Sequence, residues 1–487
     1  MLFNSYSFVL FLPIVFFIYW FIANKNLKIQ NAFLLIASYY FYSCWDWRFL
    51  FLLMFSTLLD FYTGLKMAQA DNPQKRKVWF WLSIIVNLGF LGFFKYYNFF
   101  AESFGLLLSN IGFNVTPWIL QIILPVGISF YTFHGLSYII DIYNKKITAE
   151  RNFIDYAVFV SFFPLLVAGP IERATHLLPQ IKRKRIFKYS QAVDGLRQIL
   201  WGLFKKVVIA DNCADYANLI FNNSAHYPGS VLLIGAVFFA FQIYGDFSGY
   251  SDIALGTARL FGIELLRNFA FPYFSRDIAE FWRRWHISLS SWFRDYLYIP
   301  LGGSKGRAWK KIKNTFIIFI VSGFWHGANW TFLAWGALNA LYFLPLMLFG
   351  KNRSNMEIVA LGRILPTPKE LISMITTFGL TVLAWVFFRA ANIEHALSYF
   401  SGIFSSSLFT FPKGSDFVST AITPLPMLCL LAFFNIIEWT GRAHQYAIAK
   451  MGISWHWLLR WLFYSFIIVL MGMYMKTDET PFIYFQF

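Results

Sequence analysis

A succession of long apolar segments, separated by short loops, constrains this chain more than any other feature. A bilayer's hydrocarbon core is about 30 Å thick, and a helix needs roughly 20 apolar residues to cross it. Of the 487 residues 58% are hydrophobic, 22% aromatic and only 13% charged, whereas a soluble protein carries about a quarter charged residues. We therefore predict an all-α, polytopic membrane protein that forms a single membrane domain over residues 1–487.

The apolar segments amount to about 11 to 13 spans. They are Ser7–Ala23, Gln30–Ser43, Phe49–Leu65, Val78–Tyr96, Trp118–Ile140, Phe153–Gly169, Asp194–Ala210, Val231–Phe247, Thr315–Phe324, Trp330–Phe349, Leu371–Phe388, Pro424–Trp439 and Leu458–Met475. No small-residue cleavage site follows the first segment, so we interpret it as an anchor and not as a signal peptide.

Short basic blocks predict the orientation of these spans. The net charge is +17, and the basic residues lie in short blocks between apolar segments. This distribution is explained better by a cytoplasmic membrane face than by binding to nucleic acid. The first blocks are Lys25 with Lys28, then Lys66 with Lys75, Arg76 and Lys77, then Lys145 with Lys146 and Arg151. The positive-inside rule places them in the cytoplasm and the N-terminus outside.

The segment Phe153–Gly169 breaks this alternation, because the basic run "KRKR" that begins at Lys182 follows it. Both of its flanks are therefore expected in the cytoplasm. Pro164, Gly169 and Pro170 interrupt its helical pattern. Broken backbone at membrane depth is tolerated where protein buries it, so we predict a re-entrant segment.

The polar stretch "DIAEFWRRWHISLSSWFRDYLYIPLGG", Asp277 to Gly303, is predicted to form a helix in the membrane interface. Such a helix has one aromatic and one basic polar face. The aromatic stripe at helical spacing consists of Trp282, Trp285, His286, Leu289, Phe293 and Tyr296. His286 would lie on that stripe, where a histidine packed at an interface with one hydrogen bond is the structural alternative to a functional one.

The stretch "VSGFWHGANWTFLAWGALNALYF" holds a single histidine, His326, in an apolar segment. His326, Asn329 and Trp330 follow i, i+3, i+4 spacing and are predicted to share a helix face. Gly323 and Gly327 flank the histidine and let backbone or a ligand come close. Ionisable groups in membrane segments are rare and usually mark a substrate or proton path, although a histidine that bridges two helices remains the alternative.

Two further polar stretches contain candidate residues. Asp246, Ser248, Tyr250 and Asp252 are predicted at the end of a span, where hydrogen bonds that pin a helix end and a catalytic role both fit. His134 lies near another membrane segment, and there we favour the structural role.

The motifs exclude several kinds of chemistry. The chain has no GxSxG, HExxH, P-loop or GxGxxG motif, so phosphoryl transfer and nucleotide redox lack support. Cys44, Cys213 and Cys429 are far apart and predict neither disulfides nor a metal site. Neutral imidazole can take a proton from a hydroxyl and return it to a leaving group. Two histidines without a covalent nucleophile therefore suggest direct group transfer, with no bound cofactor.

At these residues the sequence resembles the membrane-bound O-acyltransferase (MBOAT) family. "FWRRWHISLSSWFRDYLYIPLGG", followed some forty residues later by "SGFWHGANWTFLAWGALNAL", is similar to the bacterial branch with alginate and peptidoglycan O-acetyltransferases. "LPVGISFYTFHGLSYIIDIY", "FFPLLVAGPIER", "QIYGDFSGYSDIALG" and the closing "PFIYFQF" are similar to that branch too. The resemblance covers nearly the whole chain.

The resemblance implies a ring of tilted helices with funnels from both faces, a core at roughly residues 118–350 and further spans at 371–475. It implies that His326 is the catalytic residue and that His286 is a second polar residue of the site. It also implies an acetyl group taken from a cytoplasmic thioester, such as acetyl-CoA, and passed outward across a bacterial inner membrane. The expected partner is an exported SGNH-type acetyltransferase or a polysaccharide synthesis complex, with an alginate-like polysaccharide as the acceptor.

We hypothesise that His326 is the general base and that His286 orients it or shapes the donor channel. Arg283, Arg284 and Arg294 could attract the phosphates of coenzyme A, though positive-inside anchoring explains them equally well. The residues expected along the substrate and donor channel are Trp285, Trp325, Asn329, Asp246, Arg283 and Arg294.

Three other functions compete with this hypothesis. The nearest is D-alanyl transfer to teichoic acid from a carrier protein, but the spans beyond Leu371 favour the alginate branch. A transporter of acyl groups or glycans would use the histidines for proton coupling and transfer no acetyl group. A scaffold for an export complex would leave the embedded histidines unexplained.

Overall fold

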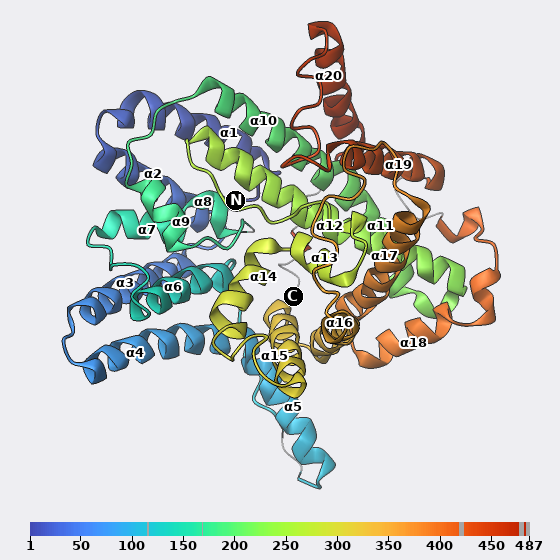
Figure 1. The fold of residues 1–487 in the computed structure, drawn as a ribbon, viewed down its shortest axis with the longest axis horizontal. Coiled ribbons are helices and arrows are strands. Elements are labelled where there is room, and N and C mark those ends of the chain that lie inside the picture. Colours follow the sequence, from blue (N-terminus) through green and yellow to red (C-terminus); the bar gives the residue numbers. More distant parts are fainter. Residues whose placement is uncertain (114–115, 168, 418–422, 477–481, 484–487) are drawn as a thin grey trace. The chain divides into compact units, whose positions relative to one another are not determined.

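The computed structural model describes the whole chain except residues 114–115, 168, 418–422, 477–481 and 484–487. In the part described, every regular element is a helix (Figure 1), which confirms the all-α prediction. The chain folds into two compact units. Unit 1 comprises Met1–Ala192 with Ala258–Leu266, and unit 2 comprises Val193–Thr257 with Arg267–Phe487.

Unit 1 contains the first nine α-helices and three short irregular helices. They are α1 (Tyr6–Phe17), η1 (Ile18–Ile22), η2 (Ala23–Lys25), α2 (Leu27–Ser43), α3 (Arg48–Gln69), α4 (Pro73–Leu91), η3 (Gly92–Tyr96), α5 (Tyr97–Asn110), α6 (Ile128–Tyr143), α7 (Phe153–Ser161), α8 (Phe163–Leu166) and α9 (Ala174–Ile181). Two helices have residues in both units, namely α10 (Tyr189–Phe204) and α12 (Gly229–Leu260).

Unit 2 holds the remaining helices. They are η4 (Lys205–Ala210), α11 (Asp211–Asn222), η5 (Ser224–His226), η6 (Pro272–Phe274), α13 (Ile278–Arg284), α14 (Ile287–Phe293), η7 (Arg294–Tyr298), α15 (Ala308–His326), α16 (Trp330–Leu348), α17 (Pro368–Arg389), α18 (Ile393–Ile403), η8 (Ser406–Phe409), η9 (Gly414–Phe417), α19 (Pro424–Gly441) and α20 (Trp457–Tyr474).

Several helix starts follow from capping residues in the sequence. Asn26 and Asn152 accept the backbone N–H groups of Lys28 and Ile154, as residues at the N-cap do. Thr367 and Glu370 form a reciprocal capping box at the start of α17. Proline occupies the first turn of α4, α17 and α19, where it breaks no hydrogen bond.

Eight helical segments in the described part are long and apolar enough to cross a membrane, so the chain is a multi-pass membrane protein. They are Tyr6–Lys25, Arg48–Gln69, Pro73–Asn110, Gly229–Leu260, Trp330–Leu348, Pro368–Arg389, Pro424–Gly441 and Trp457–Tyr474. Eight is below the predicted 11 to 13. Part of the difference comes from expected spans that form shorter helices, such as α2 with 17 residues and α7 with 9.

Two expected spans have different boundaries in the structure. The prediction of a helix from Trp118 was wrong, since α6 begins only at Ile128. Pro125 restricts the backbone before it, and Gly127 has a φ of 74°, which glycine adopts at little cost. The predicted interruption within Phe153–Gly169 is confirmed, but it lies at Phe162, between α7 and α8.

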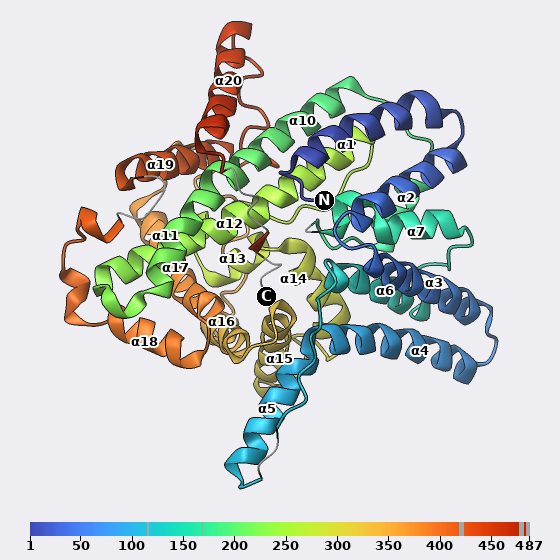
Figure 2. The same ribbon diagram turned by 180° about the vertical axis from the view of Figure 1, so that it is seen from behind.

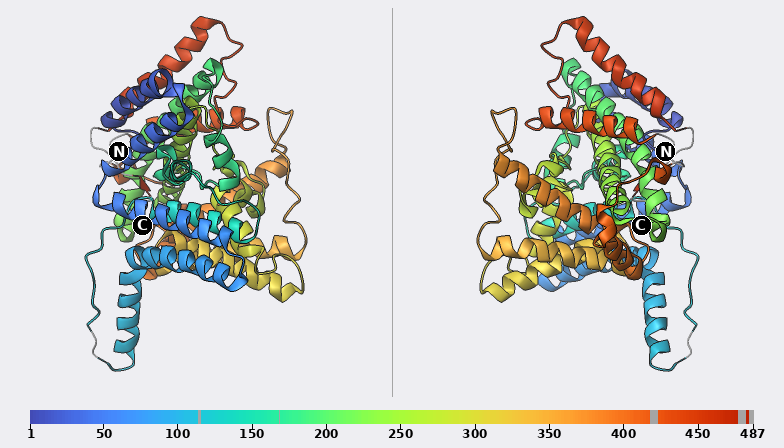
Figure 3. Two further views of the ribbon diagram at one scale, coloured as in Figure 1. Left: turned by 90° about the vertical axis from the view of Figure 1, so that its left-hand side faces the viewer. Right: turned by 90° about the vertical axis from the view of Figure 1, so that its right-hand side faces the viewer.

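A buried carboxylate stabilises the packing of three helices in unit 1. Helices α3, α4 and α6 lie side by side (Figures 1 and 2), whereas α5 runs away from them (Figure 3). Asp60 of α3 accepts hydrogen bonds from Ser83 (2.6 Å) and Asn87 (2.7 Å) of α4. A Cβ at Gly135 of α6 would lie 1.9 Å from the Asp60 carboxylate, so glycine is required for this approach.

His134 has the structural role that we favoured. Its Nε2 accepts the backbone N–H of Glu172 at 3.0 Å. The buried Glu172 carboxylate in turn contacts His176 Nδ1 (2.9 Å) and accepts the N–H of Leu266 (2.6 Å). The hydrogen bond to Glu172 raises the pKa of His176, against the opposing effect of burial. These bonds hold the segment that follows α8.

Close helix contacts and buried ion pairs organise unit 2. The polar residues from Asp246 to Asp252 lie inside α12 and not at its end, because the helix continues to Leu260. Asp252 pairs with Lys205 at 2.6 Å, and Asp246 pairs with Lys206 at 2.7 Å. Each buried charge thus has a partner of opposite sign, which burial requires.

The packing of α15 against α16 predicts the effect of one methyl group. A Cβ at Gly336 would lie 2.4 Å from the carbonyl oxygen of Phe319, whereas one at Gly379 of α17 would meet no atom within 4 Å. We expect Gly336→Ala to destabilise the protein by about 1–3 kcal/mol, since overpacking forces backbone to shift. Gly379→Ala should leave stability unchanged or slightly raise it. Thermal unfolding in detergent measures both, and equal melting temperatures would contradict the predicted contact.

Candidate functional site

His326 is the last residue of α15 and lies inside an aromatic enclosure. Its side chain is almost fully buried, with 3% of the residue exposed. The ring centres of Trp325, Trp335 and Phe388 lie 4.9, 5.3 and 5.3 Å from its own. Three elements therefore position this imidazole: the end of α15, the second turn of α16 and the end of α17.

The helix ends at His326 because Gly327 takes an extended conformation. A Cβ at Gly327 would lie 2.1 Å from the ring of Phe332, so only glycine lets that ring pack here. The predicted helix face shared by His326, Asn329 and Trp330 is therefore wrong. Asn329 instead caps α16 by accepting the N–H of Thr331 at 3.0 Å, and it donates to the carbonyl of Ala391.

His286 lies in a sharp turn, which corrects the prediction of one continuous helix over Asp277–Gly303. Helix α13 ends at Arg284, and His286 has a φ of 43° before α14 begins. Two backbone hydrogen bonds on either side hold the turn, from Ala270 N–H to the carbonyl of Arg284 and from Ile287 N–H to that of Asn268. A non-glycine residue at positive φ costs about 1–3 kcal/mol, so the surrounding contacts must impose this conformation.

The imidazole of His286 is buried among rings and not on an interface stripe. It is 1% exposed, and its ring centre lies 4.6 Å from that of Phe247 and 6.0 Å from that of Trp325. Neither of its ring nitrogens has a hydrogen-bond partner among the described residues. Burial lowers the pKa of His286 to about 3, so the ring is neutral at physiological pH.

The structure brings the two predicted histidines together. Their ring centres lie 6.4 Å apart. Because a ring nitrogen lies only about 1 Å from its ring centre, no two nitrogens come within the roughly 3 Å of a hydrogen bond. His286 therefore does not orient His326 by a direct hydrogen bond.

Tryptophans form one wall of the site, and part of that wall was not predicted. Trp285 and Trp325, both predicted channel residues, are buried. Trp385 of α17 packs against Trp285 at 5.0 Å and against Trp335 at 5.7 Å between ring centres. In the sequence Trp385 lies in an ordinary apolar segment, with no polar neighbour to distinguish it from a lipid-facing residue.

Asp246 forms a structural link close to His286. Its carboxylate accepts the backbone N–H of Ile483 at 2.6 Å and pairs with Lys206. Next to Ile483, the ring of Phe482 packs on Phe247 at 5.7 Å between ring centres, and Phe247 contacts His286. The closing motif "PFIYFQF" is thus brought beside the site through its two described residues.

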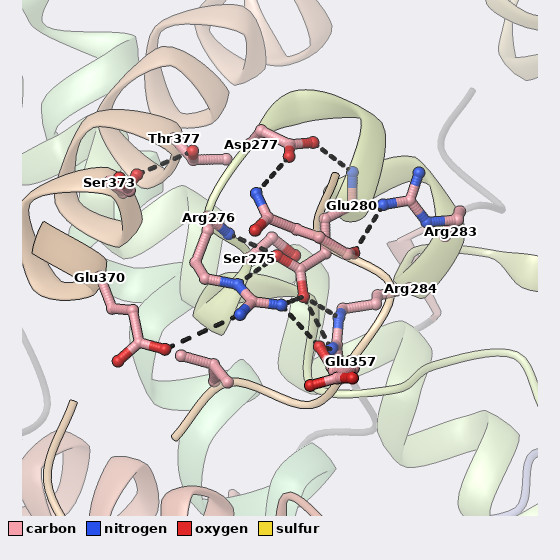
Figure 4. A network of polar contacts seen from close by, with 12 residues as sticks. Ser275, Arg276, Asp277, Glu280, Arg283, Arg284, Glu357, Glu370, Ser373 and Thr377 are labelled. Atoms are coloured by element: carbon pink, nitrogen blue, oxygen red, sulfur yellow. Dashed lines mark hydrogen bonds and ion pairs between the residues drawn. The ribbon is translucent and has the colours of Figure 1, made fainter. Parts of the chain in front are cut away.

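Arg283 and Arg284 bind protein groups. Arg283 donates to the carbonyls of Asn352 and Asn355 at 2.7 and 2.8 Å, and Arg284 pairs with Glu280 at 2.7 Å (Figure 4). They hold the loop of residues 349–367, between α16 and α17, against α13. Arg294 pairs with Asp295 at 2.7 Å, but its side chain is 60% exposed. Of the three, Arg294 is the most accessible to a ligand.

Within the described ranges, no three His, Cys, Asp or Glu residues are arranged to hold a metal ion. The three cysteines are free thiols. The site therefore consists of two imidazoles, aromatic walls and buried polar links.

Comparison with known proteins identifies the family. The profile described as "MBOAT, membrane-bound O-acyltransferase family" matches residues 111–387. The chain belongs to this family. It is an O-acyltransferase of the MBOAT type, as the resemblance of the histidine motifs predicted. The matched region includes both histidines and extends beyond the predicted core of roughly 118–350, far enough to include Trp385.

Curated relatives cover most of the chain. A probable alginate O-acetylase, AlgI, of Azotobacter vinelandii is 37% identical over 452 residues, which are 92% of this chain and 86% of that protein. A peptidoglycan O-acetyltransferase of Helicobacter pylori is 35% identical and covers 83% of this chain and 80% of that one. A teichoic acid D-alanyltransferase of Streptococcus thermophilus is 30% identical but covers only 50% of this chain. Among these three relatives, the alginate O-acetylase and the peptidoglycan O-acetyltransferase share the longer alignments with this chain.

The burial of His286 predicts how stability depends on pH. In the folded protein its pKa is about 3, whereas an unfolded histidine titrates near pH 6.5. Below about pH 6.5 the unfolded chain binds a proton that the folded protein does not, so stability falls by up to about 1.4 kcal/mol per pH unit.

Melting temperatures in detergent between pH 7.5 and 5 should therefore fall less steeply for His286→Gln than for the wild-type protein. The matched control His226→Gln replaces an exposed histidine and should keep the wild-type slope. Identical slopes for wild type and His286→Gln would contradict the burial of a neutral imidazole.

Proposed function

We propose that this MBOAT enzyme transfers an acetyl group from a cytoplasmic thioester, acetyl-CoA, for O-acetylation of an exported cell-surface polysaccharide. His326 is the general base, and His286 contacts the group that lies between the two rings. The acetyl group leaves through an exported partner, an SGNH-type acetyltransferase or a polysaccharide synthesis complex. The enzyme works in the inner membrane of a bacterium.

One observation carries this proposal: two buried imidazoles lie 6.4 Å apart between their ring centres, in an enclosure of aromatic rings. A neutral imidazole accepts a proton, whereas a protonated one cannot. Aromatic rings surround both imidazoles, and burial disfavours the charged form of His286. They also keep out water, which would hydrolyse a bound thioester.

The chemical step follows from these groups. His326 takes the proton of an acceptor hydroxyl while the hydroxyl oxygen attacks the thioester carbonyl, so that a C–O bond forms. The C–S bond then breaks, and the proton returns from the imidazole to the leaving thiolate. General acid–base catalysis of this kind contributes about 10²–10⁴-fold to a rate.

The similarity to a probable alginate O-acetylase and to a peptidoglycan O-acetyltransferase, each over more than four fifths of this chain, supports acetyl transfer to a polysaccharide. The match to a teichoic acid D-alanyltransferase covers a shorter part of this chain. D-alanyl transfer from a carrier protein is therefore the second candidate function, and the experiment below distinguishes it from acetyl transfer. A transporter would bind the donor without cleaving its thioester.

Replacing His326 should abolish transfer without removing the protein from the membrane. In cells that express the protein with its polysaccharide pathway, we expect His326→Ala to lower the O-acetyl content at least about 100-fold, since it removes the base. His226→Ala is the matched control and should retain wild-type acetylation.

Membrane content, measured by immunoblot, separates lost chemistry from lost protein. Membranes are also incubated with labelled acetyl-CoA or with a D-alanyl carrier, which tests the donor. Acetylation retained by His326→Ala would overturn the catalytic role, and transfer from the carrier alone would replace acetylation by D-alanylation.

A further inference from the structure

A cavity of about 540 Å³ opens on the surface of unit 1. All the residues that line it belong to unit 1, and they are far in the sequence from His286 and His326. It is lined by Lys28, Glu150, Arg151, Asn152, Phe153, Ile154, Asp155 and Lys182. Three segments that are distant along the chain meet here: the first turn of α2, the start of α7 and the residue that follows α9. Nothing in the proposed acyl transfer uses this cavity.

The cations of the cavity face outward. Lys28, Arg151 and Lys182 are exposed. Lys182 contacts Glu150 at 2.8 Å, whereas the side chains of Lys28 and Arg151 have no hydrogen bond or ion pair among the described residues. Two of the three positive charges are therefore available to an incoming group.

The carboxylates of the cavity are instead satisfied by the protein. Glu150 is buried and accepts the N–H groups of Arg151 and Asn152 at 2.9 and 3.0 Å. Asp155 is buried and accepts from Asn31 at 2.8 Å. Burial raises the pKa of Glu150, but the hydrogen bonds from Lys182 and from the backbone outweigh it and keep that pKa below its ordinary value. An anion that enters the cavity thus meets two free cations, while the Glu150 carboxylate is paired with Lys182 and the Asp155 carboxylate is hydrogen-bonded to Asn31.

The basic segment of residues 183–189, which follows the cavity residue Lys182, lies against the first candidate span, Tyr6–Lys25. The ring of Phe187 packs on Phe16 and Trp20 at 5.9 and 5.5 Å between ring centres. Its neighbours Ile186 and Tyr189 are 70% and 77% exposed. The exposed cations Arg183 and Lys184 precede them in the sequence, and the exposed Lys188 lies between Phe187 and Tyr189.

Basic residues interleaved with exposed apolar side chains are typical of a segment in the membrane interface. The positive-inside rule places this side of the span, which ends at Lys25, in the cytoplasm. The cavity therefore opens where the phosphates of the inner leaflet lie.

We propose that this cavity binds the phosphate headgroup of an anionic phospholipid of the cytoplasmic leaflet. Lys28 and Arg151 contact the phosphate oxygens, and guanidinium and ammonium groups both form charge-assisted hydrogen bonds with phosphate. The exposed Ile186 and Tyr189 lie in the adjoining interface. The apolar side chains are the reason to choose a lipid over a free phosphate, because a soluble anion would not require them.

Native mass spectrometry of the full-length protein in detergent tests this site. Phosphatidylglycerol and the zwitterionic phosphatidylcholine are titrated separately, and inorganic phosphate is added as a competitor. The test variant is Lys28→Gln with Arg151→Gln. The matched control is Lys75→Gln with Lys77→Gln, which removes the same charge from exposed positions of α4 outside the cavity.

Wild-type protein is expected to prefer phosphatidylglycerol, and the test variant to lose roughly 25-fold in affinity for it, since each of the two basic residues at an anionic surface contributes about fivefold. The control variant and phosphatidylcholine binding should not change. Equal binding of the two lipids, an equal loss in the control, or displacement of the lipid by an equal concentration of phosphate would each overturn the proposal.

A second measurement does not depend on the folding of a variant. Photoactivatable phosphatidylglycerol is crosslinked to the wild-type protein in bilayer nanodiscs, and the modified peptides are mapped. Adducts on residues 26–30, 150–155 or 182–189 are expected. Adducts confined to other segments would overturn the assignment.

Discussion

The burial of two imidazole rings among aromatic side chains is the constraint on which the rest of the site depends. A histidine in water is half protonated near pH 6.5, and burial disfavours the charged form of His286. For His286 the surroundings are the rings of Phe247, Phe269 and Trp325. For His326 they are Trp325, Trp335 and Phe388. Trp325 contacts both rings, so one side chain sets the spacing between them.

That arrangement requires backbone in places where a regular helix would not put it. The turn at His286 and the helix end at Gly327 each aim an imidazole into the enclosure. The polar groups around the site hold this backbone in place. Asp246 and Lys206 link α12 to Ile483, and Arg283 links α13 to the loop of residues 349–367. These charged side chains therefore have structural roles. Aromatic rings separate them from the two histidines.

The sequence was sufficient to predict the class of fold and the family, and it singled out His286 and His326 as candidate site residues. Apolar length and composition indicate membrane helices because the thickness of the bilayer fixes both. The motifs around His286 and His326 indicated the family, and the structure places these two residues together. The break within Phe153–Gly169 was also predictable, since proline and glycine disrupt a helix by their own geometry.

Other features depend on tertiary contacts that no local pattern contains. Asp277–Gly303 has helical periodicity throughout, yet hydrogen bonds with residues 268–270 turn the chain at His286. Asn329 has helical spacing from His326, but the helix ends at the intervening Gly327, which takes an extended conformation and packs against the ring of Phe332. Trp385 joins the site from a helix some sixty residues further along the chain. Arg283 carries the charge expected of a phosphate ligand and is nevertheless used to bind backbone carbonyls.

The central claim is that a reacting acyl group lies between the two imidazoles. A structure of the enzyme with a non-hydrolysable acetyl-CoA analogue tests it most directly. In this analogue a methylene group replaces the thioester sulfur. The account predicts the carbonyl of the analogue within hydrogen-bond reach, about 2.6–3.2 Å, of a His326 ring nitrogen or of the hydroxyl that it binds. An analogue bound with its carbonyl outside this enclosure, while His326 stays sealed among its rings, would contradict it.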